Sequence, residues 1–319
     1  MILVDEREFS YGKIFFAYSS QDTYPANGGL RVMTYSSYEV ARQEAIDLAA
    51  KMISKHQNYD TGFSGGKIVA AVSQVNPTVL KAVAKTVATY LNSRKGRFLT
   101  GCDLNFGEKE VSFLNQNTPC VLAALGSEVH YADATAAGVI GAVKASRNQL
   151  QLSSPTIIVH GCGAVGNRVA TQLSANLKVK TLDLVYQRAS IANCINISND
   201  TNWITQDCDV LVMASASRIL SISDLTKFKG STIVCAANLP FANKAAEHYA
   251  KQNFLVIDEG LASAGAVIAD SIEYYAPSQW AHCQPEKVYR FIENKVFTKV
   301  MQANQEVGSS SENLSLIHI

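Results

Sequence analysis

The chain has 319 residues, of which 47% are hydrophobic and 17% charged, so it can bury a large core and is not a disordered chain. Its 28 Lys and Arg residues against 27 Asp and Glu residues give a formal net charge of +1. This balance excludes a strongly basic nucleic-acid-binding protein and a strongly acidic tail protein. The length predicts about two domains, and the low share of charged residues favours a homodimer or larger homo-oligomer.

Targeting and redox features are those of a cytoplasmic protein. No apolar run approaches the roughly 20 residues of a membrane helix, and acidic residues follow Met1 where a signal peptide carries basic ones. The seven cysteines form neither a CxxC pair nor a zinc-binding spacing with His. We therefore expect reduced thiols, no metal site, and neither a membrane nor nucleic acid as a partner.

The first half of the chain reads as strands alternating with helices. Ala41, Ala45 and Leu48 recur at helical spacing behind a cap at Ser36 or Ser37, and Pro77 opens a second amphipathic helix. The predicted strands span 13–18, 30–34, 67–75 and 97–100, and the predicted helices span 38–55, 78–91 and 132–144.

The composition changes near residues 149–155, and 152–155 reads as a hinge. Several later strands are near-continuous apolar runs, which is typical of a parallel sheet covered by helices on both faces. The predicted strands span 156–160, 180–186, 209–214, 232–236 and 254–258, and the predicted helices span 165–176 and 285–307. We interpret residues 308–319 as a disordered tail.

A glycine-rich turn, Gly161-Cys-Gly163-Ala164-Val165-Gly166, lies between a predicted strand and a predicted helix. Gly161 permits a tight turn, Gly163 lets the backbone approach a pyrophosphate, and Gly166 lets helix and strand pack closely. The turn predicts a site for NAD or NADP, with the phosphates at the start of the helix around Ala164 and Val165. The alternative is a βα turn that binds no ligand.

The choice between NAD and NADP stays open at this point. Asp183 lies 22 residues after Gly161, the spacing of an acid that holds the ribose hydroxyls. If the strand continues to Tyr186, however, it ends beside Arg188, which would hold a 2′-phosphate.

Two lysines and an aspartate suggest chemistry in the first half. Lys55 ends the first amphipathic helix, Lys67 follows two glycines, and Asp103 follows a short strand. Each is most simply a solvated surface charge, but the glycines before Lys67 would give a ligand close access to the backbone beside a buried amine. A desolvated lysine serves as acid or base near neutrality, and a nearby carboxylate carries protons.

The motifs together resemble the glutamate/leucine/phenylalanine/valine dehydrogenases, with a layout closest to the leucine, phenylalanine and tryptophan enzymes. The similarity covers roughly residues 15 to 275. The residues that carry it are Gly28-Gly-Leu-Arg31, Met52-Ile-Ser-Lys55, Ser64-Gly-Gly-Lys67, Thr100-Gly-Cys-Asp103, Thr135, Gly161 to Gly166, and Ala264-Gly-Ala-Val-Ile268.

The resemblance implies an α/β protein of two domains with the active site in the cleft between them. Residues 1–148 would form the substrate-binding and catalytic domain, with helix 285–307 packing back on it. Residues 149–284 would form a Rossmann-type, doubly wound dinucleotide-binding domain.

The resemblance also implies residue roles. Lys55 would hold the substrate α-carboxylate, Lys67 would be the catalytic lysine, and Asp103 would shuttle protons to and from the amine. Thr135 would contact the nicotinamide amide, and Asn238 would lie near the nicotinamide ribose. The reaction would be reversible oxidative deamination of an L-amino acid to a 2-oxo acid and ammonia.

The chain departs from the family where the substrate binds. By the resemblance, Gly28 and Gly29 would bind the substrate, and Ser263 stands where the family has an Asn that helps to hold it. By the same resemblance, Asn27 and Asp270 would occupy the two positions that set side-chain preference. A buried anion repels a carboxylate and attracts a cation or an N–H donor, so we expect a basic or N–H-bearing substrate side chain, suited to a biosynthetic role.

Two other functions stay open. One is a different NAD(P) oxidoreductase with a Lys–Asp pair, similar to shikimate dehydrogenase. The other is a non-catalytic relative that binds dinucleotide without turnover; the presence of both Lys67 and Asp103 argues against it.

Overall fold

The computed structural model describes residues 1–21, 23–215 and 217–309, with side chains to residue 303. The chain divides into two compact units, residues 1–128 with 267–283 and residues 129–266 with 284–319. No helix in these described ranges is both long and apolar enough to span a membrane. The predicted tail from residue 310 onward lies outside the described residues.

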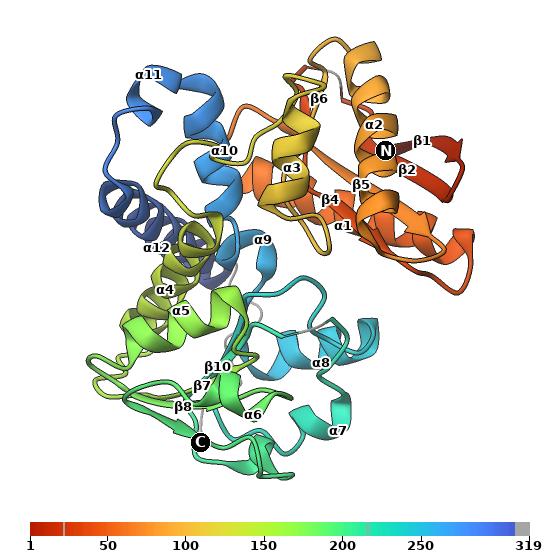
Figure 1. The fold of residues 1–319 in the computed structure, drawn as a ribbon. Helices are drawn as coiled ribbons and strands as arrows, with labels where there is room; N and C mark the ends of the chain where they lie inside the picture. The colour runs from red at the N-terminus through yellow and green to blue at the C-terminus, as the bar shows by residue number, and fades with distance from the viewer. Residues whose placement is uncertain (22, 216, 310–319) are drawn as a thin grey trace. The chain divides into compact units, whose positions relative to one another are not determined.

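The first unit is built on a six-stranded mixed sheet in the order β1-β2-β5-β3-β6, with β4 also pairing with β5 (Figure 1). Strands β1, β2 and β5 pair antiparallel, and the other pairs are parallel. Its elements are β1 (Ile2–Phe9), β2 (Gly12–Ser19), β3 (Ala26–Asn27), β4 (Leu30–Met33), α1 (Tyr38–Tyr59), β5 (Ser64–Val72), α2 (Pro77–Ser93), β6 (Phe98–Leu99), α3 (Glu108–Asn115), most of α10 (Gly265–Tyr275) and α11 (Pro277–Trp280).

Alternation along the strands gives this sheet two distinct faces. Phe15 and Val69 pack with the alanines of α1. Phe16 and Ile68, one residue along, belong to a larger core with α2 and α3. The same alternation places Arg31 in β4 and Lys67 in β5 on the face toward α1, because Leu30 and Ile68 belong to the α2 face.

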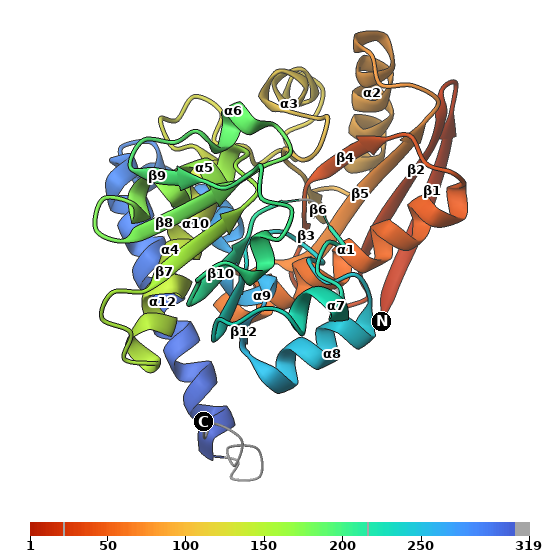
Figure 2. The same ribbon diagram turned by 90° about the horizontal axis from the view of Figure 1, so that it is seen from below.

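The second unit is built on a six-stranded parallel sheet in the order β12-β11-β10-β7-β8-β9. Figure 2 shows β8, β7 and β10 side by side. The chain order reverses between β7 and β10, which is the switch point of a doubly wound fold. The elements are α4 (Tyr131–Gln149), β7 (Thr156–His160), α5 (Ala164–Leu173), β8 (Lys178–Leu182), α6 (Tyr186–Ala189), β9 (Cys194–Asn196), a 3₁₀ turn (Trp203–Thr205), β10 (Val210–Met213), α7 (Ile222–Leu225), β11 (Thr232–Cys235), α8 (Lys244–Asn253), β12 (Leu255–Ile257), α9 (Glu259–Ala262) and α12 (Pro285–Ser309).

The predicted α/β class, with a Rossmann-type second half, is confirmed, but the division between the units is not where the composition placed it. The chain passes into the second unit at residue 129, before α4, instead of at 149. The final helix does contact α4, yet both helices are part of the second unit. Small residues explain the close packing, because a Cβ on Gly141 would lie 2.4 Å from the Glu293 carbonyl oxygen of α12.

Three predicted element ends also differ. The first helix continues past Lys55 to Tyr59, and β5 spans Ser64–Val72, so Lys67 lies inside the strand and not at its start. The strand predicted to reach Tyr186 ends at Leu182. β1 was not predicted, because charged side chains dominate its sequence, as they do in many edge strands.

Candidate active site

Two glycines, Gly28 and Gly29, lie between β3 and β4, two short strands that both pair with β5. The backbone N–H of Ile68 donates to the Gly29 carbonyl at 3.3 Å, so this pair runs beside Lys67. A Cβ on Gly28 would come within 1.8 Å of the Gly66 carbonyl oxygen, and one on Gly29 within 3.3 Å of Lys67 Nζ. Both positions therefore exclude a side chain, and Gly29 lies against the amine.

The glycines that precede Lys67 have a different role from the predicted one. A Cβ on Gly65 would meet the backbone nitrogen of Ile53 at 2.2 Å, and one on Gly66 would meet the Phe98 ring at 2.9 Å. The space is thus filled by α1 and β6. The expectation that these two glycines give a ligand access to the backbone is wrong; they allow close packing of the chain itself.

Lys67 is a buried amine of the first unit, with 5% of its surface exposed. Its Nζ forms an ion pair with Asp103 Oδ2. Burial lowers the pKa of Lys67, and the Arg31 charge acts in the same direction against the opposing effect of Asp103. Lys67 is therefore a cation that loses its proton more easily than an exposed lysine does.

Asp103 follows β6 and is held by two cations. Besides Lys67, Arg31 donates from Nε to Oδ2 at 3.1 Å and from Nη2 to Oδ1 at 3.4 Å. Burial disfavours the charged carboxylate, but Lys67 and Arg31 outweigh it and hold the pKa of Asp103 well below its usual range. Asp103 accepts a proton only after one of these cations loses its charge. Because an arginine keeps its proton, that cation is Lys67.

The other substrate-binding candidates of the first unit are also buried. Lys55 lies in the penultimate turn of α1 and is 7% exposed, so it is not the solvated charge that a helix end suggests. Asn27 and Asp270, 243 residues apart in the chain, meet in a buried hydrogen bond of 2.7 Å from Nδ2 to Oδ2. The two side chains that were predicted to set the substrate preference are therefore in direct contact, while their role in binding stays a prediction.

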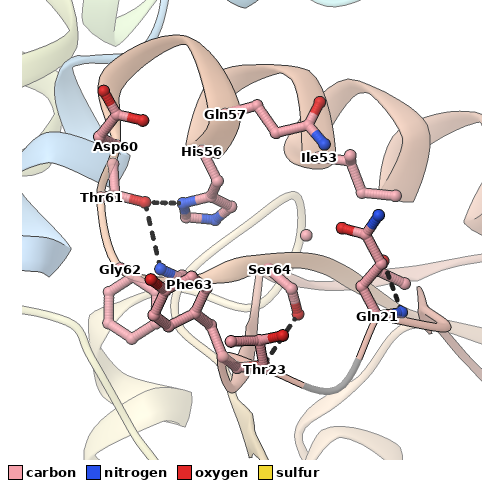
Figure 3. A pocket seen from close by; sticks show the side chains of 13 residues that line it. Gln21, Thr23, Ile53, His56, Gln57, Asp60, Thr61, Gly62, Phe63 and Ser64 are labelled. Carbon is pink, nitrogen blue, oxygen red and sulfur yellow. Dashed lines mark hydrogen bonds between the residues drawn. The ribbon is translucent and has the colours of Figure 1, made fainter.

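His56 connects this pair to a pocket of about 250 Å³ at the end of α1 (Figure 3). Its Nε2 lies 3.2 Å from the Asn27 carbonyl oxygen and its Nδ1 lies 2.7 Å from Thr61 Oγ1. Because a carbonyl only accepts, Nε2 carries the hydrogen and Nδ1 accepts from the Thr61 hydroxyl. Burial lowers the pKa of His56 to about 4, so the ring is neutral at pH 7.

The glycine turn of the second unit combines two positions where a side chain would clash with one that is open. Gly161 has φ +91° and a Cβ there would lie 2.6 Å from the Ser215 backbone, while one on Gly166 would lie 1.8 Å from the Gly161 carbonyl oxygen. A Cβ on Gly163 would meet nothing within 4 Å. The open position is the one expected to face a pyrophosphate, and Ala164 and Val165 begin α5 there.

Asp183 and Arg188 are the two residues that were expected to decide between NAD and NADP. β8 ends at Leu182, so Asp183 directly follows the strand, and its Oδ2 accepts from the Cys162 N–H at 2.8 Å. Arg188 lies in α6 and lines a hollow of about 650 Å³ together with Gly163. The sequence left open whether this strand ends before Asp183 or continues to Tyr186. The structure has the first of these ends, which is followed directly by Asp183.

The remaining candidates belong to the second unit. Thr135 lies half-buried in the first turns of α4, and Asn238 lies half-buried in the loop after β11. Ser263 is buried and its hydroxyl donates to the Glu259 carbonyl at 3.1 Å.

Sequence reasoning missed Arg31, Glu44 and His56. Arg31 stood in the quoted Gly28 to Arg31 motif without a role. The alternation of β4 places it on the same face as Lys67, which is the signal that could have found it. His56 follows Lys55 directly, but it was assigned no role from the sequence.

Comparison with known proteins gives matches in both sequence and fold. The family model described as Glutamate/Leucine/Phenylalanine/Valine dehydrogenase matches residues 175–317. Phenylalanine dehydrogenase of Bacillus thermotolerans is 25% identical over 273 residues, 79% of this chain and 70% of that protein. L-tryptophan dehydrogenase of Nostoc punctiforme is 26% identical over 256 residues, 76% and 71%. The hetero-hexameric glutamate dehydrogenase of Thermus thermophilus, with leucine bound, has a similar fold, with a TM-score of 0.79 at 20% identity over 98% of this chain and 84% of that one.

Proposed function

We propose that this chain oxidises an L-amino acid with a nicotinamide cofactor. The proposal is supported by the match of residues 175–317 to the glutamate/leucine/phenylalanine/valine dehydrogenase model and by the similarity to phenylalanine and L-tryptophan dehydrogenases. The substrate and water give a 2-oxo acid and ammonium, the hydride goes to NAD⁺ or NADP⁺, and one proton is released. The reverse reaction is reductive amination. The buried ion pair of Lys67 with Asp103 is the observation that carries this proposal.

The residues of the first unit have distinct tasks in this reaction. Lys55 binds the substrate α-carboxylate with its ammonium group. Lys67, once neutral, takes a proton from the water that attacks the imine carbon and, when protonated, polarises the carbonyl. Asp103 moves a proton to and from the substrate nitrogen when Lys67 has lost its charge.

The residues of the second unit hold the dinucleotide, which when bound accepts the hydride. Gly163 lets the pyrophosphate approach the start of α5, and Thr135 and Asn238 orient the nicotinamide end. The cofactor is NAD, because Asp183 at the end of β8 accepts hydrogen bonds from ribose hydroxyls and repels a 2′-phosphate. Arg188 is the group that favours the alternative, NADP.

The substrate side chain is basic or carries an N–H donor. Asp270 is 8% exposed and bonds to Asn27 within the same unit, so its charge lies in a medium that strengthens its effect on a ligand. A carboxylate on the substrate side chain would meet repulsion there, and a cation or an N–H group would meet an acceptor.

The first experiment measures absorbance at 340 nm with NAD and with NADP against the twenty L-amino acids at alkaline pH. We expect turnover with NAD, and a loss of about 10²- to 10⁴-fold in Lys67→Met. Binding of NADH, followed by fluorescence, controls for folding. No turnover with any amino acid, and none with 2-oxo acids plus ammonium, while NADH still binds, would favour the dinucleotide-binding relative without activity.

Two pairs of variants test the finer assignments. Asp183→Ser should raise the ratio of kcat/KM for NADP over NAD at least about tenfold, whereas Arg188→Ala should leave NAD turnover unchanged.

Asp270→Asn should reduce the preference for basic over apolar amino acids by about tenfold. Asp60→Asn, at an exposed acid of the same unit, is the control. A wild-type preference for apolar amino acids that survives in Asp270→Asn contradicts the side-chain assignment.

A further inference from the structure

Arg31 lies behind the Lys67–Asp103 pair and is itself held by a second acid. Leu30 and Val32 are part of the apolar core toward α2, so Arg31 points to the opposite face, where α1 lies. Its Nη1 pairs with Glu44 of α1, while its Nε and Nη2 donate to the two oxygens of Asp103. Both edges of the guanidinium are thus used by carboxylates.

The four groups form a row of alternating charge: Lys67, Asp103, Arg31 and Glu44. Two cations and two anions sum to zero when Lys67 is protonated. The charged groups that act on Lys67 come from three elements: Asp103 after β6, Arg31 in β4 and Glu44 in α1. The neighbouring Tyr35 stays neutral, because burial and Glu44 raise the pKa of its phenol.

We propose that Arg31 is a positioning residue, which, anchored by Glu44, holds the Asp103 carboxylate against the Lys67 amine and supplies a positive charge that stays constant through proton transfer. This inference rests on the proposed function, in which Lys67 and Asp103 exchange protons with the reacting groups. An arginine suits the task because it binds both carboxylate oxygens in a planar fork and does not lose its proton.

The row predicts that the loss of Arg31 and the loss of the Glu44 charge have opposite effects on Lys67. Without Arg31, Lys67 loses a repelling cation and Asp103 becomes a stronger partner, so the lysine holds its proton to higher pH. Without the Glu44 charge, the guanidinium is no longer compensated, so Lys67 loses its proton at lower pH. A group that only supports the fold has no reason to move the titration in opposite directions at the two positions.

The test reads the titration of Lys67 directly, by NMR of protein labelled with ¹³C at the lysine Cε and assigned with Lys67→Arg. We expect Arg31→Gln to raise the midpoint by about 1 pH unit and Glu44→Gln to lower it by about 0.5. Arg31→Lys, which keeps the charge but not the fork, should lie between Arg31→Gln and the wild type. Arg42→Gln, a cation of the same helix α1 that pairs with Glu6 at the exposed surface, should leave the midpoint unchanged.

The alkaline rise of kcat/KM for amino-acid oxidation should move with the NMR midpoint in each variant. Two results overturn the role of Arg31. One is a shift of the same sign in Arg31→Gln and Glu44→Gln, and the other is a midpoint in both variants that differs from the wild type by less than about 0.3 pH unit. Opposite NMR shifts in a protein that oxidises no amino acid would instead contradict the proposed function alone, because the titration does not depend on turnover.

Discussion

In the first unit the candidate catalytic residues lie within and between strands, whereas in the second unit the candidate cofactor residues follow the ends of strands. Lys67 is the fourth residue of the nine-residue β5, and Gly161 and Asp183 follow β7 and β8. A site inside a sheet has neighbours on every side. The space beside its glycines is therefore occupied by other protein atoms, and its charged side chains are buried in pairs. A site at strand ends leaves open space, as at Gly163.

The largest effect that would test this contrast is expected from Gly28→Ala. The new Cβ would lie 1.8 Å from the Gly66 carbonyl oxygen, so two backbone segments must separate. We expect a loss of at least about 3 kcal/mol in the free energy of unfolding of the first unit. Urea unfolding, with amide hydrogen exchange to locate the change, measures it.

Gly107→Ala is the matched control in the same unit, because its Cβ would meet only the flexible Glu110 carboxylate at 3.7 Å. Equal stability of Gly28→Ala and Gly107→Ala would contradict the close packing described for the β3–β4 junction.

The second prediction concerns the loss of folding stability at acid pH. His56 is neutral in the fold with a pKa of about 4, against about 6.5 in an unfolded chain. The unfolded chain therefore binds the proton first, and stability present above pH 6.5 is lost as the pH falls toward 4. This group accounts for about 3 kcal/mol of that loss. Thermal or urea unfolding at pH 7 and pH 4.5 should show a smaller difference in His56→Gln than in the wild type.

His248→Gln, at an exposed position of α8, should keep the full pH dependence of the wild type. An identical loss of stability on acidification in His56→Gln and wild type would show that the buried imidazole does not carry this effect.

The smallest expected change in stability is that of Gly163→Ala. Its φ of −71° suits any residue, and its Cβ would point into open space. We expect less than about 0.5 kcal/mol of change in unfolding, yet about tenfold weaker binding of NADH, because the methyl group stands where the pyrophosphate approaches. Fluorescence titration and thermal unfolding of the same sample separate the two. An unchanged affinity for NADH would contradict the prediction that the pyrophosphate binds at this turn.

The parallel sheet of the second unit was predictable because its signals are local. The central strands β7, β10 and β11 are largely apolar runs, and the glycine turn lies between a strand and a helix within a few residues. The position of Asp183 needed the end of β8, which the sequence left between Leu182 and Tyr186. The domain boundary was missed because the composition of α4 does not distinguish the two units. Its packing against α12, α5 and other elements of the second unit assigns it.

The site of the first unit was less accessible to sequence reasoning. Lys55, Lys67 and Asp103 were singled out by spacing and by resemblance to a family. Arg31 and Asp103 are 72 residues apart and meet only through the order of strands. The filled space at Gly65 and Gly66 likewise depends on which helix and strand pack against β5, so the sequence alone suggested access for a ligand instead.

The interleaved path of the chain bears on how the protein is made. Asp270, which bonds to Asn27, belongs to a segment that returns to the first unit after most of the second has been synthesised. The unit that leaves the ribosome first is therefore completed late, once residue 283 has emerged. Until then, the surfaces that the returning segment covers are exposed on the nascent chain, and a truncation before residue 267 would leave Asn27 without the carboxylate it bonds to.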